Sequence, residues 1–208
     1  MRSAKVKKSP SFFREPKHFE YFAKEVVARA AEEAGKNGKR IRVWSAGCST
    51  GEEPYSIAIT IAGGIPGISL WDAKILATDL STKVLGKAAA GLYKEDRLKT
   101  VSPQLRSKYF SCVEVKPEKI YRVGDDVRRL VHFGRLNLME HWPMRGTFNA
   151  IFCRNVMIYF DKPTQEKLVG RFWDVLVPGG VLFLGHSESL TGIRHRFGYV
   201  QPTVYRKP

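Results

Sequence analysis

The sequence has few cysteines and no long apolar run. Cys48, Cys112 and Cys153 are its only cysteines, too few and too widely spaced for a disulfide framework or a zinc site, so no metal is expected. No segment approaches the roughly 20 consecutive apolar residues of a membrane-spanning helix, so we expect no membrane insertion. Residues 1–10 are basic but lead into no apolar stretch, so no secretory signal is expected there. Buried free thiols in a reducing, cytoplasmic environment are the expected arrangement.

Acidic residues are also scarce relative to basic ones. The chain carries 35 lysines and arginines against 20 aspartates and glutamates, a formal net charge of +15. A charge of this sign favours an acidic partner, such as nucleic acid, an anionic membrane or a carboxylate-rich protein, without choosing among them. A solvated basic surface explains the charge equally well. Hydrophobic residues fill 43% of the 208 positions, enough for the core of one domain.

Apolar patterns predict strands that alternate with helices. Helices are expected over 16–34, after Gly51, over 82–90 and over 161–180, the last with a Pro-Gly stop. Strands are expected over 41–46, 73–80, 130–137, 148–155 and 181–187. Strand–helix units in series predict a parallel sheet with right-handed crossovers, and residues 197–207 predict a closing antiparallel hairpin. Gly35 and Gly91 are expected to end helices, and Ser81 and Asp161 to cap them.

The region 100–130 departs from this alternation. It is charged, contains Pro103 and Pro117, and has short strand-like pieces in FSCVEVK and KIYRVG. We interpret it as a small antiparallel insertion. The expected organisation is therefore a basic tail over residues 1–10 and one domain over residues 11–208.

A glycine turn follows the first predicted strand. Ala46 ends that strand, and Gly47 and Gly51 follow with G-x-x-x-G spacing, which is neither the dinucleotide fingerprint nor the phosphate loop. Glu52 and Glu53 come next. Carboxylates would repel a phosphate but suit a cationic ligand or an amine, although they would also complement the dipole of the following helix.

Other polar residues follow the ends of the neighbouring strands. These are Asp79 after the second strand, Asn137 after the third and Arg154 with Asn155 after the fourth. In a parallel sheet all of these positions meet at one edge, where an acidic residue after the second strand binds ribose hydroxyls. A ligand with a ribose, an adenine-like base and a positive charge fits S-adenosylmethionine better than NAD or ATP.

Several long stretches together point to a family: SFFRE, VWSAGCSTGEEPYSIA, ILATDLS, FGRLNL, IFCRNVMIYFDK and PGGVLFLGHSESL. They resemble the chemotaxis-receptor glutamate O-methyltransferases of the CheR type over about residues 11–206. The resemblance implies an α/β fold, the class I S-adenosylmethionine-dependent methyltransferase (Rossmann-like) sheet with a small β-subdomain. It also implies methylation of glutamate side chains on the cytoplasmic helices of chemoreceptors, with S-adenosylhomocysteine as the product. A monomer is expected, and no nucleic-acid partner.

The resemblance also implies roles for individual residues. Arg14 and Tyr159 are expected to flank the point of methyl transfer. The implied cofactor-binding set is Ser11, Arg14, Ala46, Gly47, Glu52, Asp79, Asn137, Leu138, Arg154 and Asn155.

The N-terminal part of the sequence departs from the family pattern. The family usually carries asparagine six residues before the arginine of FFR and threonine four before it, where this chain has Lys8 and Pro10. Ser11 would replace the threonine hydroxyl only if the backbone shifts. The family normally has an all-helical domain before the catalytic one, and this chain begins where the catalytic domain would, so that helical domain is expected to be absent.

Two other functions remain open on the sequence alone. A nucleic-acid methyltransferase would share the fold and explain the basic charge, but the fourth strand is followed by CRNVMIYF rather than the D/N-P-P-aromatic motif of amino-directed base methylases. A signalling module that binds S-adenosylmethionine or its product without transferring the methyl group would fit the changes at Lys8 and Pro10. Methyl transfer to a receptor distinguishes the enzyme from both.

Overall fold

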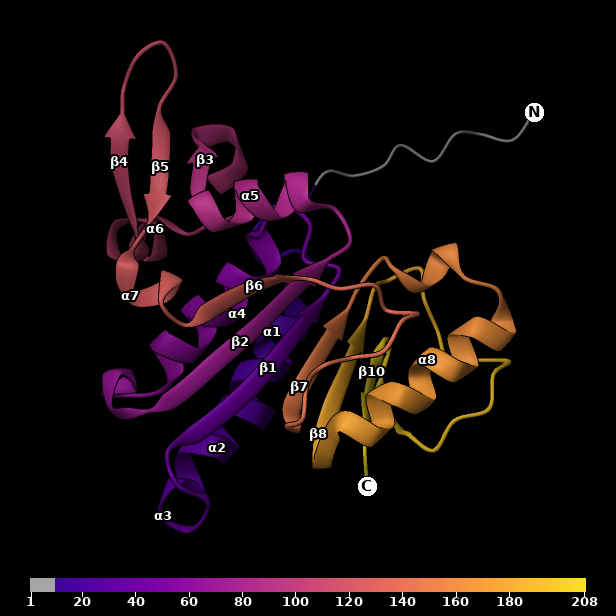
Figure 1. Ribbon diagram of the computed structural model, residues 1–208. Helices are drawn as coiled ribbons and strands as arrows, with labels where there is room; N and C mark the ends of the chain where they lie inside the picture. The colour runs from indigo at the N-terminus through magenta and orange to yellow at the C-terminus, as the bar shows by residue number, and fades with distance from the viewer. Residues whose placement is uncertain (1–9) are drawn as a thin grey trace, which may run out of the picture.

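A central sheet of seven strands organises the protein, whose computed structural model describes residues 10–208 (Figure 1). In spatial order the strands are β6 (Val131–Arg135), β2 (Asp72–Asp79), β1 (Arg40–Ala46), β7 (Phe148–Cys153), β8 (Leu176–Leu184), β10 (Val204–Arg206) and β9 (Gly198–Gln201). The strands from β6 to β8 are parallel, and β10 and β9 form the antiparallel end. This order confirms the predicted Rossmann-like sheet and closing hairpin. The order reverses between β1 and β7, which is where such sheets bind ligands.

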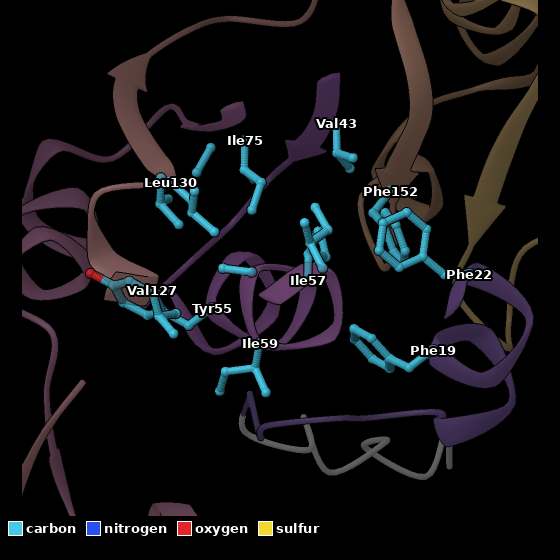
Figure 2. Close-up of a cluster of buried hydrophobic side chains, with 14 of the residues drawn as sticks. Phe19, Phe22, Val43, Tyr55, Ile57, Ile59, Ile75, Val127, Leu130 and Phe152 are labelled. Atoms are coloured by element: carbon cyan, nitrogen blue, oxygen red, sulfur yellow. The ribbon is translucent and has the colours of Figure 1, made fainter. Parts of the chain in front are cut away.

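Helices cover both faces of the sheet. The chain order gives α1 (Pro16–Tyr21), a π-helical turn η1 (Phe22–Val27), α2 (Ala28–Glu32), α3 (Ala34–Asn37), α4 (Glu52–Gly64), α5 (Thr82–Ala90) and α8 (Lys162–Val175). Neighbouring β1 residues point to opposite sides, so Val43 packs in the core cluster with α1 and α4, and Trp44 packs in the cluster with α8. Figure 2 shows the first cluster, in which the rings of Phe19 and Phe22 lie 5.8 and 5.4 Å from that of Phe152.

A second, three-stranded antiparallel sheet stands beside the main one (Figure 1). It contains β3 (Leu92–Lys94), β5 (Ile120–Val123) and β4 (Phe110–Glu114), with η3 (Glu95–Leu98), α6 (Pro103–Tyr109) and α7 (Asp125–Arg128) around it. The strands expected in FSCVEVK and KIYRVG are present. The third strand, β3, lies before the expected insertion and was not predicted. It pairs with Ile120–Arg122, which lies far from it in the sequence, and local patterns do not reveal such a pairing.

The expected helix ends were partly wrong. The helix expected over 16–34 ends at Glu32 with a turn at Glu33. Gly35 lies inside the short α3, and Gly38, whose φ is 70°, follows that helix. The helix expected over 161–180 ends at Val175, and Leu176 already begins β8, so Pro178 and Gly179 lie in a strand rather than at a helix end. Asp161 is confirmed as a cap, because its carboxylate accepts a hydrogen bond from the Thr164 amide at 3.0 Å. Ser81 occupies the cap position of α5 without a side-chain hydrogen bond to that helix.

No helix within residues 10–208 combines the length and the apolar character needed to cross a bilayer.

Candidate active site

The turns after β1, β2 and β7 pack together at the carboxyl edge of the sheet. The amides of Gly47 and Cys48 donate to the Thr78 carbonyl at 2.8 and 2.9 Å. Gly47 has a φ of 90°, and a Cβ there would lie 2.4 Å from Val156 Cγ2. Only glycine satisfies both the left-handed backbone and this close approach. These contacts hold the three turns together at this edge of the sheet.

Asp79 fastens the turn after β1 to the end of β2. Its carboxylate accepts hydrogen bonds from the Ser49 amide at 2.9 Å and the Ser81 amide at 3.0 Å. A carboxylate has about four acceptor positions, so these bonds leave acceptor capacity for the hydroxyl groups of a ligand. The structure thus places Asp79 where the sequence predicts a ribose-binding acid.

Glu52 is buried beneath the turn rather than displayed on it. The side chain is 1% exposed, and its carboxylate accepts hydrogen bonds from Thr50 Oγ1 at 2.6 Å and from the Arg97 guanidinium. These contacts hold the turn in place. Its predicted contact with the cofactor stays a prediction, and the structure shows a supporting role.

Arg154 lies at the centre of a buried charge cluster with Glu15 and Glu53. Its side chain is 4% exposed, with Nη2 at 3.0 Å from the Glu15 carboxylate and Nη1 at 3.2 Å from the Glu53 carboxylate. Arg154 Nη2 also donates to the Arg14 carbonyl. Burial raises the pKa of Glu53, and the charge of Arg154 opposes that shift. The guanidinium is thus bonded to protein groups and holds the Arg14 segment against β7.

Glu15 extends this cluster to the loop after β8. Its carboxylate accepts a hydrogen bond from the His186 amide at 3.2 Å and lies 3.3 Å from His18 Nδ1. The backbone here is strained, since Phe13 has a φ of 50° and Glu15 a φ of 62°. The residues on either side of Arg14 are therefore held in costly conformations by specific contacts.

The segment before Arg14 is anchored on the core. Phe12 is fully buried, with its ring 4.9 Å from that of Tyr93, and its carbonyl accepts a hydrogen bond from Thr100 Oγ1 at 2.7 Å. The Phe13 amide donates to Ser56 Oγ at 2.9 Å. Ser11 is half-buried just before these anchors. Lys8 lies outside the described residues.

Asn137 and Leu138 lie just beyond β6, beside the end of β2. The Leu136 amide donates to the Asp79 carbonyl at 3.1 Å. The Asn137 side chain bonds within its own turn, to the Met139 amide and to Glu140, both at 3.0 Å. Leu138 is buried in the second core cluster. The structure brings both residues to the predicted edge, where their predicted adenine contacts remain predictions.

Glu188 is a site residue that the sequence reasoning missed. It is 6% exposed, and its carboxylate accepts hydrogen bonds from the amides of Asn155 and Gly185 at 2.7 Å each, and of Ile158 at 3.2 Å. It thereby sets the left-handed conformation of Asn155, whose φ is 61°. The available signal was its place just after the last parallel strand, in GHSESL.

Tyr159 lies on the outer side of the same loop. It ends the 3-10 turn η4 (Met157–Tyr159), and it is 62% exposed. Arg14, on the neighbouring segment, keeps a 31% exposed side chain. The predicted pair thus lies on two adjoining segments that Arg154 and Glu188 hold in place.

None of the cysteines has the character of a nucleophile at this edge. Cys48 and Cys153 are buried, and burial raises the pKa of both thiols. Cys112 is exposed on β4, so the prediction of buried thiols is wrong for this residue. Within the described residues, no three His, Cys, Asp or Glu side chains are grouped to hold a metal ion.

His18 makes the stability of this region depend on pH. Burial, together with the charge of Arg154, lowers its pKa to about 4. The unfolded imidazole titrates at roughly 6.5, so between these pH values only the unfolded state binds the proton, and stability falls as the pH drops through this window. We expect roughly 3 kcal/mol of such loss, and a much smaller loss in His18→Gln. Urea unfolding at about pH 7 and about pH 4.5 checks this, and equal losses in both proteins would contradict it.

Comparison with known proteins decides the family. The family model for the CheR methyltransferase, SAM binding domain, matches residues 8–206. The chain belongs to this CheR family. This confirms the predicted resemblance, the class I methyltransferase fold and S-adenosylmethionine as the cofactor.

Named relatives agree with the CheR assignment. A probable chemotaxis protein methyltransferase of Rhizobium etli is 47% identical over 94% of this chain and 73% of its own length. The chemotaxis protein methyltransferases of Salmonella typhimurium and Escherichia coli are 44% and 43% identical over 94% of this chain. The chain spans 65% of the length of each of these two relatives.

Proposed function

We propose that this chain transfers a methyl group from S-adenosylmethionine to glutamate side chains on the cytoplasmic helices of chemoreceptors. It would act in the cytoplasm, as a monomer, with residues 11–208 as the methyltransferase domain and the region about 100–130 as its β-subdomain. The observation that carries the proposal is Arg14, which Arg154 fastens to the carboxyl edge of the sheet of a CheR-family fold. The names of the relatives support the receptor as substrate.

The residues at the edge suit the cofactor chemically. Asp79 offers carboxylate oxygens to ribose hydroxyls. The turn after β1 carries carboxylates and no lysine, so it does not resemble a phosphate cradle. The edge therefore fits a cationic nucleoside better than a nucleotide phosphate.

The chain's own residues would orient and shield the reacting groups. When bound, S-adenosylmethionine supplies an electrophilic methyl group that an ionised carboxylate can take by direct displacement. A glutamate is already ionised at neutral pH, so the site needs no strong base. Arg14 would direct the incoming carboxylate by charge-assisted hydrogen bonds, and Tyr159 would close the site against water. Opposite charges diminish as the reaction proceeds, so Arg14 should orient the carboxylate more than neutralise it.

A methyl-transfer assay tests the proposed function. Tritiated S-adenosylmethionine and a chemoreceptor cytoplasmic fragment should yield labelled receptor whose label is released by base, because methyl esters hydrolyse and methylamines do not. Cofactor binding without transfer to any receptor would contradict the enzyme assignment. Label in RNA rather than in receptor would indicate a nucleic-acid methyltransferase.

Asp79→Ala is expected to weaken cofactor binding. The substitution removes an acceptor of charge-assisted hydrogen bonds, each contributing about 1.5–3 kcal/mol, so the affinity for S-adenosylhomocysteine should fall at least about tenfold. Isothermal titration calorimetry measures this. Asp72→Ala is the matched control, since Asp72 starts the same strand at the opposite edge and should leave affinity unchanged. Equal affinities for the Asp79 variant and the unaltered protein would refute the role.

A further inference from the structure

The turn η4 displays two large apolar side chains beside the candidate active site. Ile158 is 50% exposed and Tyr159 is 62% exposed, and they are consecutive residues. Single exposed apolar residues are ordinary, but neighbouring ones at the edge of a functional site indicate an interaction surface. The position of η4 directly after β7 puts them at the edge where methyl transfer is proposed.

This turn is held rigidly from beneath. The Ile158 amide donates to the buried Glu188 carboxylate at 3.2 Å. Gln165 Nε2 donates to the carbonyls of Met157 and Phe160, both at 3.0 Å. A loop with satisfied backbone groups on its inner side presents its outer side chains in a fixed position, so little ordering entropy is lost when a partner binds.

A cation and a hollow adjoin the turn. A hollow of about 180 Å³ lies between η4, the start of α8 and the loop after β8, with Ile158, Lys162 and Ser187 among its lining residues. Lys162 Nζ donates to the Thr191 carbonyl at 3.1 Å, and across residues 10–208 no carboxylate forms an ion pair with it. The nearby Asp161 carboxylate is bonded to the first turn of α8. Lys162 therefore keeps its charge available to a partner.

The turn after β2 repeats this pairing of an apolar side chain with a cation. Leu80 is 57% exposed, and Arg135 Nε donates to its carbonyl at 3.4 Å. Arg135 ends β6 and is itself exposed. The carboxyl ends of the parallel strands share one edge of the sheet, so both pairs border the same site (Figure 1).

We propose that Leu80, Arg135, Ile158, Tyr159 and Lys162 form a docking rim for an acidic amphipathic helix of the receptor, next to the glutamate that is methylated. Apolar residues three or four positions apart on such a helix would contact Leu80, Ile158 and Tyr159. Its carboxylates would pair with Arg135 and Lys162, in keeping with the net charge of +15. The inference rests on the proposed function and adds how this domain recognises its substrate.

Steady-state methylation of a receptor cytoplasmic fragment tests the docking rim. Ile158→Ser and Lys162→Glu should each raise the KM for the fragment about tenfold and leave kcat and the affinity for S-adenosylhomocysteine within about twofold. The controls are Leu70→Ser and Lys39→Glu. Leu70 is 72% exposed in η2 (Ile68–Leu70), and both control residues lie before parallel strands, at the opposite edge of the sheet.

Each outcome separates the two proposals. If the unaltered protein methylates the fragment and both rim variants keep its KM, the docking rim is wrong and the proposed function stands. If the control variants raise the KM as much as the rim variants, the rim is also wrong, because the effect is not local. If the unaltered protein methylates no receptor fragment, the proposed function itself fails.

Discussion

Arg14→Ala is expected to lower the turnover of receptor methylation about a hundredfold and to leave cofactor affinity within about twofold. Arg14 is held on a segment whose neighbours, Phe13 and Glu15, have left-handed backbones, and its carbonyl is bonded to Arg154. Its 31% exposed side chain can reach an incoming carboxylate without first giving up a buried position. Removing it takes away orientation while the cofactor-binding residues stay in place. Single-turnover methyl transfer at saturating receptor measures the effect.

Matched variants sharpen the Arg14 result. Arg14→Lys keeps the charge but loses the planar fork that pairs with a carboxylate, so we expect an intermediate turnover. Arg40→Ala removes an exposed arginine at the start of β1, at the opposite edge, and should change nothing. Unchanged receptor methylation by Arg14→Ala would remove Arg14 from the mechanism and leave Tyr159 as the remaining candidate.

Arg154→Leu is expected to destabilise the protein by about 3–5 kcal/mol, because it leaves buried carboxylates without the cation that pairs with them. Glu15 is 5% exposed at its side chain and 3.0 Å from Arg154, and Glu53 is 3.2 Å away. Burial already raises the pKa of Glu53, and loss of Arg154 should raise it further. Urea unfolding at about pH 7 measures the change in the free energy of unfolding.

A surface ion pair provides the comparison for Arg154. Arg196 lies 3.2 Å from Asp174, and both side chains are mostly exposed, so Arg196→Leu should cost no more than about 1 kcal/mol. Similar small losses in the two variants would show that the Arg154 cluster does not hold the N-terminal segment. A large loss confined to Arg154→Leu would support the view that Arg154 is a positioning residue for Arg14.

Much of the fold could be predicted because its signals are local. Apolar runs marked the parallel strands, and Asp161 marked the start of α8 as a cap. The helix end predicted at Gly35 was wrong, since Gly35 lies inside α3 and it is Gly38 that has the positive φ. A glycine permits a helix end but does not impose one, and tertiary packing selects among the candidates.

By itself, the sequence determined the sheet, the edge where polar residues gather and the CheR family. These follow from hydrophobic period, strand polarity and long motifs. Only the tertiary structure decided which polar groups hold the turns around the site in place and which groups face the site itself. Arg154 meets Glu15 across 139 positions, and Glu188 meets Asn155 across 33. No local pattern predicts such contacts, because they depend on how separate turns meet once the core has packed.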